Sequence, residues 1–276
     1  MVGCLVGKVM LAKGVNKEGL KAVLQQVWRT FKKVKIESVG NNIFMFKFIE
    51  EADKNRVIKG GPWHSDRALI VLAEPRGIGE VAKQSFTHTS FWVKILNVPI
   101  ACMDKDFLWD LGGKIGSVEE VETDGNGDCI GEYARIRVLI NITQPLERIL
   151  FLKQECETDI PMPVVYERLP DFCYCCGIIG HQYKECDKYQ DQPQEDLPYG
   201  SWMKAITVGG FTKRYQNKGR WNYGVGKSNE KSASSENHSF QQQQGQNQAN
   251  PIGANGSVQN EKEMGQTMEH AKNDVI

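Results

Sequence analysis

Residues 34–49, VKIESVGNNIFMFKFI, decide the fold of the N-terminal part of this 276-residue chain. Residues 34–39 alternate apolar and polar side chains, and residues 43–49 are rich in aromatic and β-branched ones, which is typical of strands. Gly40, Asn41 and Asn42 between them favour a tight turn. The stretch therefore predicts a β-hairpin, whose second strand carries Phe44, Phe46 and Phe48 on one face.

Elements on either side of the hairpin complete the order βαββαβ. They are a strand at 7–12, a helix from residue 17 to about 31 that Asn16 caps, a helix at 51–59 that Gly60-Gly61-Pro62 ends, and a strand at 68–72. This order is the split βαβ arrangement of ferredoxin-like folds. We expect the three phenylalanines to face the covering helices, rather than to stack bases as sheet aromatics of RNA-recognition motifs do.

Part of this pattern recurs further along the chain. The predicted elements are a strand at 91–96, a helix at 104–115, paired strands at 118–122 and 133–142, and strands near 146–152 and 164–168. We therefore predict an α+β domain over residues 1–168. It consists of a ferredoxin-like βαββαβ unit, about 1–76, and a partial second unit, about 86–168.

The C-terminal part differs in composition. Residues 230–276 are rich in Gln, Asn and Ser and have almost no large apolar side chain, so we expect a disordered tail. No uncharged apolar run approaches the roughly 18 residues of a membrane span, and lysines interrupt the apolar start of the chain, unlike a signal peptide. We expect an intracellular protein, with the nucleus favoured over the cytoplasm.

Four of the eight cysteines lie in the sequence CYCCGIIGHQYKEC at residues 173–186. Cys173, Cys176, His181 and Cys186 have the spacing C-x2-C-x4-H-x4-C, and three thiolates with one imidazole suit tetrahedral zinc. In a chain without secretory features, clustered cysteines indicate a metal rather than disulfides. We predict one structural Zn²⁺ in a knuckle at 169–190, with Cys175 outside the ligand set. Because so small a module has no core, we expect metal binding and folding to be one event.

Knuckles of this kind are recurring modules of single-stranded RNA binding. Tyr174 and Tyr183 occupy positions at which retroviral-type knuckles carry base-contacting side chains. We expect these two tyrosines and Lys184 to contact RNA or single-stranded DNA. The alternative is a protein–protein interaction adaptor with a purely structural zinc clip, since Lys184 is the knuckle's only basic residue and Glu185 lies beside it.

A basic and aromatic linker follows at 191–229. Its residues 201–229 hold six basic side chains and no acidic one, and cations with interleaved rings suit sequence-tolerant binding of single strands. The residues that we expect to extend the nucleic-acid site are Lys213, Arg214, Lys218, Arg220 and Trp221. A solvated linker is the alternative.

Net charge is zero, with 34 basic and 34 acidic side chains, which argues against a general electrostatic binder of nucleic acid. The charge is segregated, however. It is +7 over residues 1–59, −7 over 100–170, −4 over 171–200 and +6 over 201–229. We therefore expect any nucleic acid to contact the basic first unit or the 201–229 segment, with the acidic middle facing away.

Residues 166–186 also carry a specific resemblance. They resemble the YERLPDFCxxCGxxGHxxxxC signature of a large plant family that joins a domain of unknown function to a zinc knuckle. Other matching stretches are GGPW at 60–63, FWV at 91–93, RIRV at 135–138 and YGSW at 199–202. Much of this family looks derived from LINE-type, non-LTR retrotransposons, and the chain resembles their first-open-reading-frame products over about residues 1–205.

The resemblance implies zinc and nucleic-acid binding and no characterised enzyme activity. Longer relatives continue into endonuclease and reverse transcriptase domains, so we expect a truncated or domesticated copy. We also expect the N-terminal domain to act as a scaffold or a self-association unit.

No group of residues predicts catalysis. Residues 77–82, GIGEVA, lack the strand–helix context of a dinucleotide-binding loop. Asp124, Asn126 and Asp128 are spaced like calcium ligands, but Cys129 and Arg135 stand where a calcium loop needs Gly and Glu, so we predict a hairpin turn. Zinc held by four protein ligands leaves no position for a catalytic water. We therefore expect no enzyme activity, no small-molecule substrate and no membrane binding.

Overall fold

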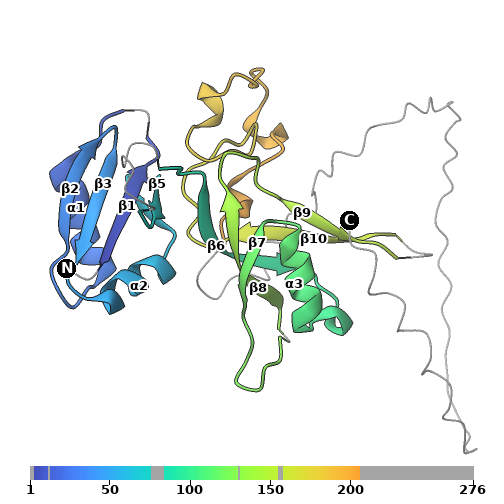
Figure 1. Cartoon of the computed structure of the whole chain (residues 1–276). Helices are drawn as coiled ribbons and strands as arrows, with labels where there is room; N and C mark the ends of the chain where they lie inside the picture. The colour runs from blue at the N-terminus through green and yellow to red at the C-terminus, as the bar shows by residue number, and fades with distance from the viewer. Residues whose placement is uncertain (1–2, 12, 76–83, 130, 155–157, 206–276) are drawn as a thin grey trace, which may run out of the picture. The chain divides into compact units, whose positions relative to one another are not determined.

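The structure, a computed structural model, describes residues 3–11, 13–75, 84–129, 131–154 and 158–205 (Figure 1). These residues form two five-stranded antiparallel sheets followed by a small cysteine-rich region. Among the described helices, none has the length and apolar character needed to cross a membrane. The predictions for residues 77–82, for the basic segment beyond residue 205 and for the C-terminal tail fall outside the described residues.

The first sheet has the strand order β2-β3-β1-β5-β4. Its elements are β1 (Gly3–Val9), α1 (Lys17–Trp28), β2 (Lys35–Gly40), β3 (Ile43–Phe48), α2 (Glu51–Lys59), β4 (Trp63–Ser65) and β5 (Ala68–Ala73). Apart from the short additional strand β4, this is the βαββαβ order of a ferredoxin-like unit. The predicted fold class is confirmed here, and the hairpin of β2 and β3 lies where the sequence indicates.

Both ends of β1 and the end of α1 differ from the prediction, since β1 spans Gly3–Val9 rather than residues 7–12. Strand β1 begins at Gly3 rather than at residue 7, because it pairs along the whole of β3, from Gly3 opposite Phe48 to Lys8 opposite Ile43. Helix α1 begins after Asn16, whose side chain accepts a hydrogen bond from the N–H of Gly19 as predicted.

Helix α1 ends at Trp28 rather than near residue 31. Arg29 adopts a left-handed conformation with φ 47°. The backbone N–H groups of Phe31 and Lys32 then donate to the carboxylate of Asp53 in α2, at 2.9 and 3.0 Å. This carboxylate replaces the helix carbonyls as acceptor, so the chain leaves the helix early and the Phe31 ring is 70% exposed.

The three phenylalanines of β3 are buried core residues, as expected. They pack with Leu20, Leu24 and Trp28 of α1, and the Trp28 ring meets the Phe46 ring edge-on at 4.9 Å. On the opposite face, the central strands carry Cys4, Val6 and Lys8 on β1 and Ile43, Met45 and Lys47 on β3. That face therefore lacks the aromatic pair on which an RNA-recognition motif stacks bases.

The second sheet has the strand order β7-β8-β6-β10-β9. Its elements are β6 (His88–Leu96), the 3₁₀ helix η2 (Ile100–Cys102), α3 (Lys105–Gly113), β7 (Ser117–Val121), β8 (Tyr133–Asn141), β9 (Ile149–Leu152) and β10 (Ile160–Tyr166). This order repeats that of the first sheet strand for strand. The segment between β8 and β9 contains no helix, so the second unit is partial, as predicted.

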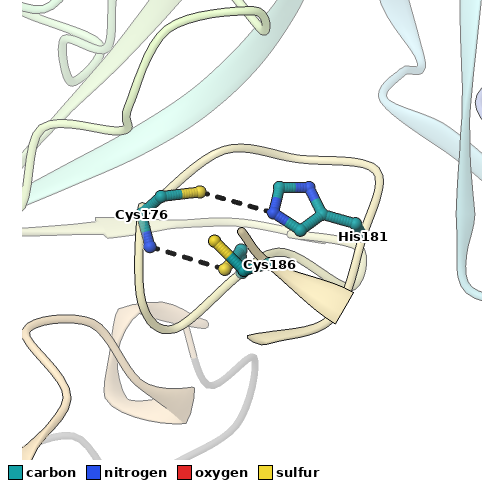
Figure 2. A group of neighbouring side chains, drawn as sticks. Cys176, His181 and Cys186 are labelled. Carbon is teal, nitrogen blue, oxygen red and sulfur yellow. Dashed lines mark hydrogen bonds between the residues drawn. The ribbon is translucent and has the colours of Figure 1, made fainter. Parts of the chain in front are cut away.

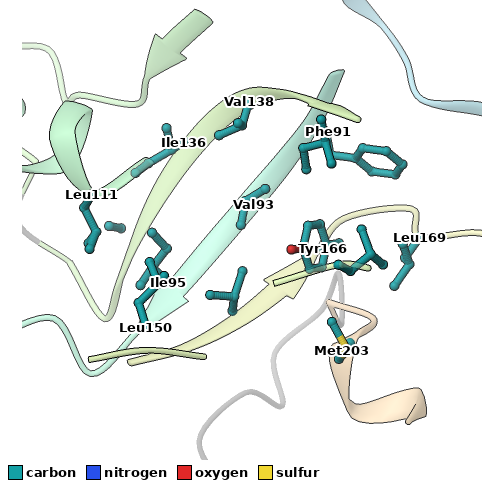
Figure 3. Close-up of a cluster of buried hydrophobic side chains, with 14 of the residues drawn as sticks. Phe91, Val93, Ile95, Leu111, Ile136, Val138, Leu150, Tyr166, Leu169 and Met203 are labelled. Atoms are coloured by element: carbon teal, nitrogen blue, oxygen red, sulfur yellow. The ribbon is translucent and has the colours of Figure 1, made fainter. Parts of the chain in front are cut away.

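The core of the second unit lies between its sheet and α3, which packs on β7 and β8 (Figure 3). Fully buried side chains from β6, β8, α3 and β10 form it: Phe91, Val93, Ile95, Ile136, Val138, Leu111, Val164 and Tyr166. Strand β10 ends at Tyr166 rather than at residue 168, because Arg168 has a positive φ of 52°. The predicted turn between β7 and β8 is confirmed, since Asp124 Oδ1 accepts hydrogen bonds from the N–H groups of Asn126 and Asp128.

Candidate metal centre and nucleic-acid site

The cysteine-rich region begins with a tight hairpin around Cys173 and Cys176. Phe172 and Ile179 pair across it. The N–H of Cys173 donates to the carbonyl oxygen of Ile178 at 2.9 Å, and the N–H of Gly177 donates to the carbonyl oxygen of Cys173 at 2.8 Å. Gly177 adopts φ 76°, a conformation that glycine reaches without strain. The hairpin therefore presents the thiols of Cys173 and Cys176 to the same point.

A second loop supplies the other two candidate ligands. Gly180, with φ 113°, turns the chain so that His181 faces the hairpin, and the 3₁₀ helix η3 (Tyr183–Glu185) leads into Cys186. Sγ of Cys176 lies 3.4 Å from Nε2 of His181, and the side chain of Cys186 converges on the same place (Figure 2).

The donor set fits a tetrahedral metal ion. The three sulfur atoms and the imidazole nitrogen all lie within 4.8 Å of one another. Metal–sulfur bonds of about 2.3 Å and metal–nitrogen bonds of about 2.0–2.1 Å place the ligands of such an ion roughly 3.5–3.8 Å apart. A small contraction of the cluster would bring all four atoms into range of one ion.

The thiols of this cluster differ in acidity. Burial raises the pKa of Cys173 to about 12. A hydrogen bond with His181 lowers the pKa of the more exposed Cys186 to about 6. The thiol of Cys186 therefore loses its proton more readily than that of Cys173, whose proton a metal ion must displace on binding.

Three tyrosines form a row beside the candidate ligands, which we call the tyrosine row: Tyr174, Tyr183 and Tyr189. The rings of Tyr174 and Tyr183 are nearly parallel, at 9°, with centroids 6.1 Å apart. Tyr189 meets Tyr183 edge-on at 5.2 Å. The structure thus brings together the two tyrosines that the sequence predicts as base contacts. The sequence does not predict Tyr189 as part of this row. Its place three residues after the last candidate ligand is the sequence feature that points to it.

The remaining predicted contacts have two different outcomes. Lys184 lies exposed in η3, next to Tyr183 in the tyrosine row. The residues that lie outside the described part of the chain are Lys213, Arg214, Lys218, Arg220 and Trp221.

The expectation that the knuckle has no core is wrong. Phe172, Cys173 and Ile179 are buried, and Phe172 and Ile179 belong to the hydrophobic cluster that contains Phe91 and Tyr166 of the second sheet. The N–H of Leu146, before β9, also donates to the carbonyl oxygen of Gly177 at 3.0 Å. The first half of the knuckle is therefore part of the second unit. The large apolar side chains of Phe172 and Ile179 are the feature of the sequence that indicates this packing.

The face of the second sheet opposite α3 carries rings and cations, but the cations already pair with these rings and with carboxylates. The guanidinium of Arg135 lies 3.9 Å from the centroid of the Trp92 ring and donates to Glu167 at 2.8 and 2.9 Å. Arg137 pairs with Glu119 at 3.0 Å. These contacts neutralise the face locally, so the tyrosine row is the better candidate for contact with nucleic acid.

Comparisons with known proteins divide the chain in the same way. Residues 2–74 match the model of a domain of unknown function, DUF4283, and residues 140–188 match the model of a zinc knuckle. The knuckle model begins before β9, in accord with the packing of the knuckle on the second unit. A search of curated proteins finds no match to the chain.

Two solved structures with paired RNA-binding domains resemble parts of the chain. The first is RNA recognition domains 1 and 2 of Sex-lethal from Drosophila melanogaster, with 17% sequence identity, 49% of this chain and 85% of that chain covered, and a TM-score of 0.23. The second is the first two RRM domains of yeast poly(U)-binding protein Pub1, with 12% identity, 59% of this chain and 98% of that chain covered, and a TM-score of 0.22. Likeness at these TM-scores carries no argument about function. The family models show an order of domains: a region similar to the DUF4283 domain precedes a region similar to a zinc knuckle, and the second region contains the cluster of three cysteines and one histidine.

Proposed function

We propose that this protein is a non-enzymatic, zinc-dependent binder of RNA or single-stranded DNA whose contact site is the tyrosine row. The observation that carries the proposal is the parallel pair of Tyr174 and Tyr183 beside four metal-type ligands. Tyr174 stands between the first two ligands and Tyr183 between the last two. One ion bound by all four would therefore hold the two rings in a fixed relation.

Each part of the site has a distinct role in this proposal. Bound zinc supplies only cross-linking, because four protein ligands leave no position for a catalytic water. The rings of Tyr174 and Tyr183 stack on unpaired bases, which is worth about 1–3 kcal/mol per base. Lys184 and the cations of residues 201–229 attract phosphates, and this contribution weakens as salt rises.

The proposed target is single-stranded, because paired bases keep their faces within the duplex and are not free to stack on tyrosine. An origin as a retrotransposon first-open-reading-frame protein and an intracellular, preferentially nuclear, place of action belong to the same proposal. The origin rests on the resemblance of residues 1–205 to that plant family, whereas the place of action rests on the sequence features described above.

One observation favours a second candidate function. Residues 171–200 carry a net charge of −4, and acidic side chains repel phosphates. In the second candidate the zinc orders the end of the domain for a protein partner, and the protein is an interaction adaptor.

A salt titration of RNA binding separates the two functions. Full-length protein with one equivalent of zinc is titrated into a labelled single-stranded RNA at several salt concentrations, as wild type, as His181→Ala and as the double variant Tyr174→Ala/Tyr183→Ala. The nucleic-acid proposal predicts binding by the wild type only, with an affinity that falls as salt rises. If RNA affinity stays at background in all three proteins while zinc still orders the wild-type knuckle, the adaptor is favoured.

A further inference from the structure

The chain after the knuckle, at residues 198–205, returns to the knuckle and to the second sheet; we call it the strap. At its start, the N–H of Tyr199 donates to the carbonyl oxygen of Tyr174 at 3.1 Å. Arg148 donates to the carbonyl oxygen of Pro198 at 2.8 Å, and its guanidinium lies 5.5 Å from the centroid of the Tyr199 ring. Arg148 therefore fixes both the backbone and the ring at this end of the strap.

The ring of Tyr199 lies directly on the hairpin that carries Cys173 and Cys176. A Cβ atom added to Gly177 would clash with Cζ of this ring. Gly177 follows Cys176 immediately, and its positive φ is part of the hairpin turn. The ring thus supports the backbone of the turn on the side where glycine leaves room for it.

The far end of the strap is anchored to the second sheet. Met203, in the 3₁₀ helix η5 (Ser201–Met203), is fully buried in the same cluster as Tyr166 and Leu169 (Figure 3). Lys204 pairs with Tyr166 in parallel, and the N–H of Ala205 donates to the carbonyl oxygen of Tyr166 at 2.8 Å. With both ends held, the strap keeps the backbone of Tyr199 beside the hairpin.

We propose that Tyr199, held by Arg148, is a positioning residue of the metal site. It keeps the Cys173–Cys176 hairpin in ligand geometry in the metal-free protein. The ion then binds first to these two preorganised ligands, and the loop of His181 and Cys186 closes on it afterwards. This inference rests on the metal site of the proposed function but not on nucleic-acid binding. Residues outside the ligand set that orient ligands commonly change metal affinity by about 10- to 100-fold.

Metal affinity of the full-length protein tests the proposal. Zinc is removed by competition with a chromophoric chelator, and cobalt absorption reports the number of thiolate ligands. We expect Tyr199→Ala to weaken zinc binding about 10- to 100-fold with one ion still bound, and Tyr199→Phe, which keeps the ring, to restore the affinity. Trp109→Ala is the control, because Trp109 is an exposed ring on α3, outside the knuckle, and we expect the zinc affinity of this variant to stay at the wild-type value.

Hydrogen exchange of the metal-free protein gives a second readout. We expect the amides of Cys173 and Gly177 to be protected in metal-free wild type and to exchange rapidly in Tyr199→Ala, with the His181–Cys186 loop exchanging rapidly in both. If Tyr199→Ala unfolds the second unit, the amides of β6 and β8 lose protection. In that case the measurement is made on Tyr199→Leu instead. Equal zinc affinity and equal hairpin exchange in wild type and variant would overturn the inference. Absence of a thiolate–cobalt spectrum in wild type would instead overturn the metal site of the proposed function.

Discussion

Sγ of Cys176 lies 3.4 Å from Nε2 of His181, close to the roughly 3.5–3.8 Å that separates two ligands of one tetrahedral zinc ion. Cys176 comes from a hairpin packed on the second sheet, whereas His181 comes from the loop that follows Gly180. The metal site therefore joins a hairpin that shares the hydrophobic core of the second unit to a loop, residues 181–186, that contributes no side chain to that core.

The assignment of the four ligands predicts which cysteine substitutions remove the metal. Cys173→Ser, Cys176→Ser and Cys186→Ser should each lose most zinc affinity, because each removes one of four ligands. Cys175→Ser is the matched control within the same hairpin and should bind one zinc ion with wild-type affinity. Cobalt titration of the four variants measures this, and loss of binding in Cys175→Ser would contradict the ligand assignment.

Asp53 should stabilise the first unit in a pH-dependent way. It is buried, and burial alone would raise its pKa, but the N–H groups of Lys32 and Phe31 and the charges of Arg56 and Lys32 lower the pKa below the ordinary value of 3.8. A carboxyl whose pKa is lower in the folded state contributes its full stability above the unfolded pKa and loses it as pH falls through the folded pKa.

The corresponding variant is Asp53→Asn. We expect it to lower the free energy of unfolding by about 1–3 kcal/mol at pH 7, because two N–H groups lose a charged acceptor. The difference from wild type should shrink as the pH falls below about 4. Urea unfolding at pH 7 and at pH 3 measures both values, and a difference independent of pH would show that the carboxylate charge is not the cause.

Neighbouring positions on α3 should differ sharply in their effect on stability. Leu111 is fully buried in the second core, whereas Trp109 is 43% exposed. Leu111→Ala should cost about 2–5 kcal/mol through lost burial and a cavity. Trp109→Ala should cost less than about 1 kcal/mol. Chemical unfolding of the two variants tests the placement of the core, and equal losses would contradict it.

The face of the second sheet opposite α3 should not take part in RNA binding. Arg135→Gln removes the closer of two cations that pair with Glu167, the other being Lys94 at 3.5 Å, and should lower stability by about 1–2 kcal/mol, since the pair is partly exposed. RNA affinity should stay within about twofold of wild type, because the tyrosine row and Lys184 are unchanged. A loss of tenfold or more in a folded variant would place the contact on the sheet instead.

The elements that the sequence predicts best are those fixed by local chemistry. Phe44, Phe46 and Phe48 alternate within a strand that follows two turn-forming asparagines, and the structure has this hairpin as expected. The spacing of Cys173, Cys176, His181 and Cys186 predicted a cluster that the fold does bring together.

Contacts between distant segments explain most of what the sequence did not predict. The end of α1 depends on Asp53, more than twenty residues away, and the start of β1 depends on the full length of β3. The role of Tyr199 depends on Gly177 and Arg148, which only the fold brings to it. Local propensity contains none of these contacts.

The dissociation constant of full-length protein for a single-stranded RNA, measured with zinc and after chelation of zinc, tests the central claim most directly. The account predicts tight, salt-sensitive binding with zinc, and a loss of at least about tenfold both on chelation and in Tyr174→Ala/Tyr183→Ala, since stacking contributes about 1–3 kcal/mol per base. Equal affinity with and without zinc, unchanged by the two tyrosine substitutions, would contradict it.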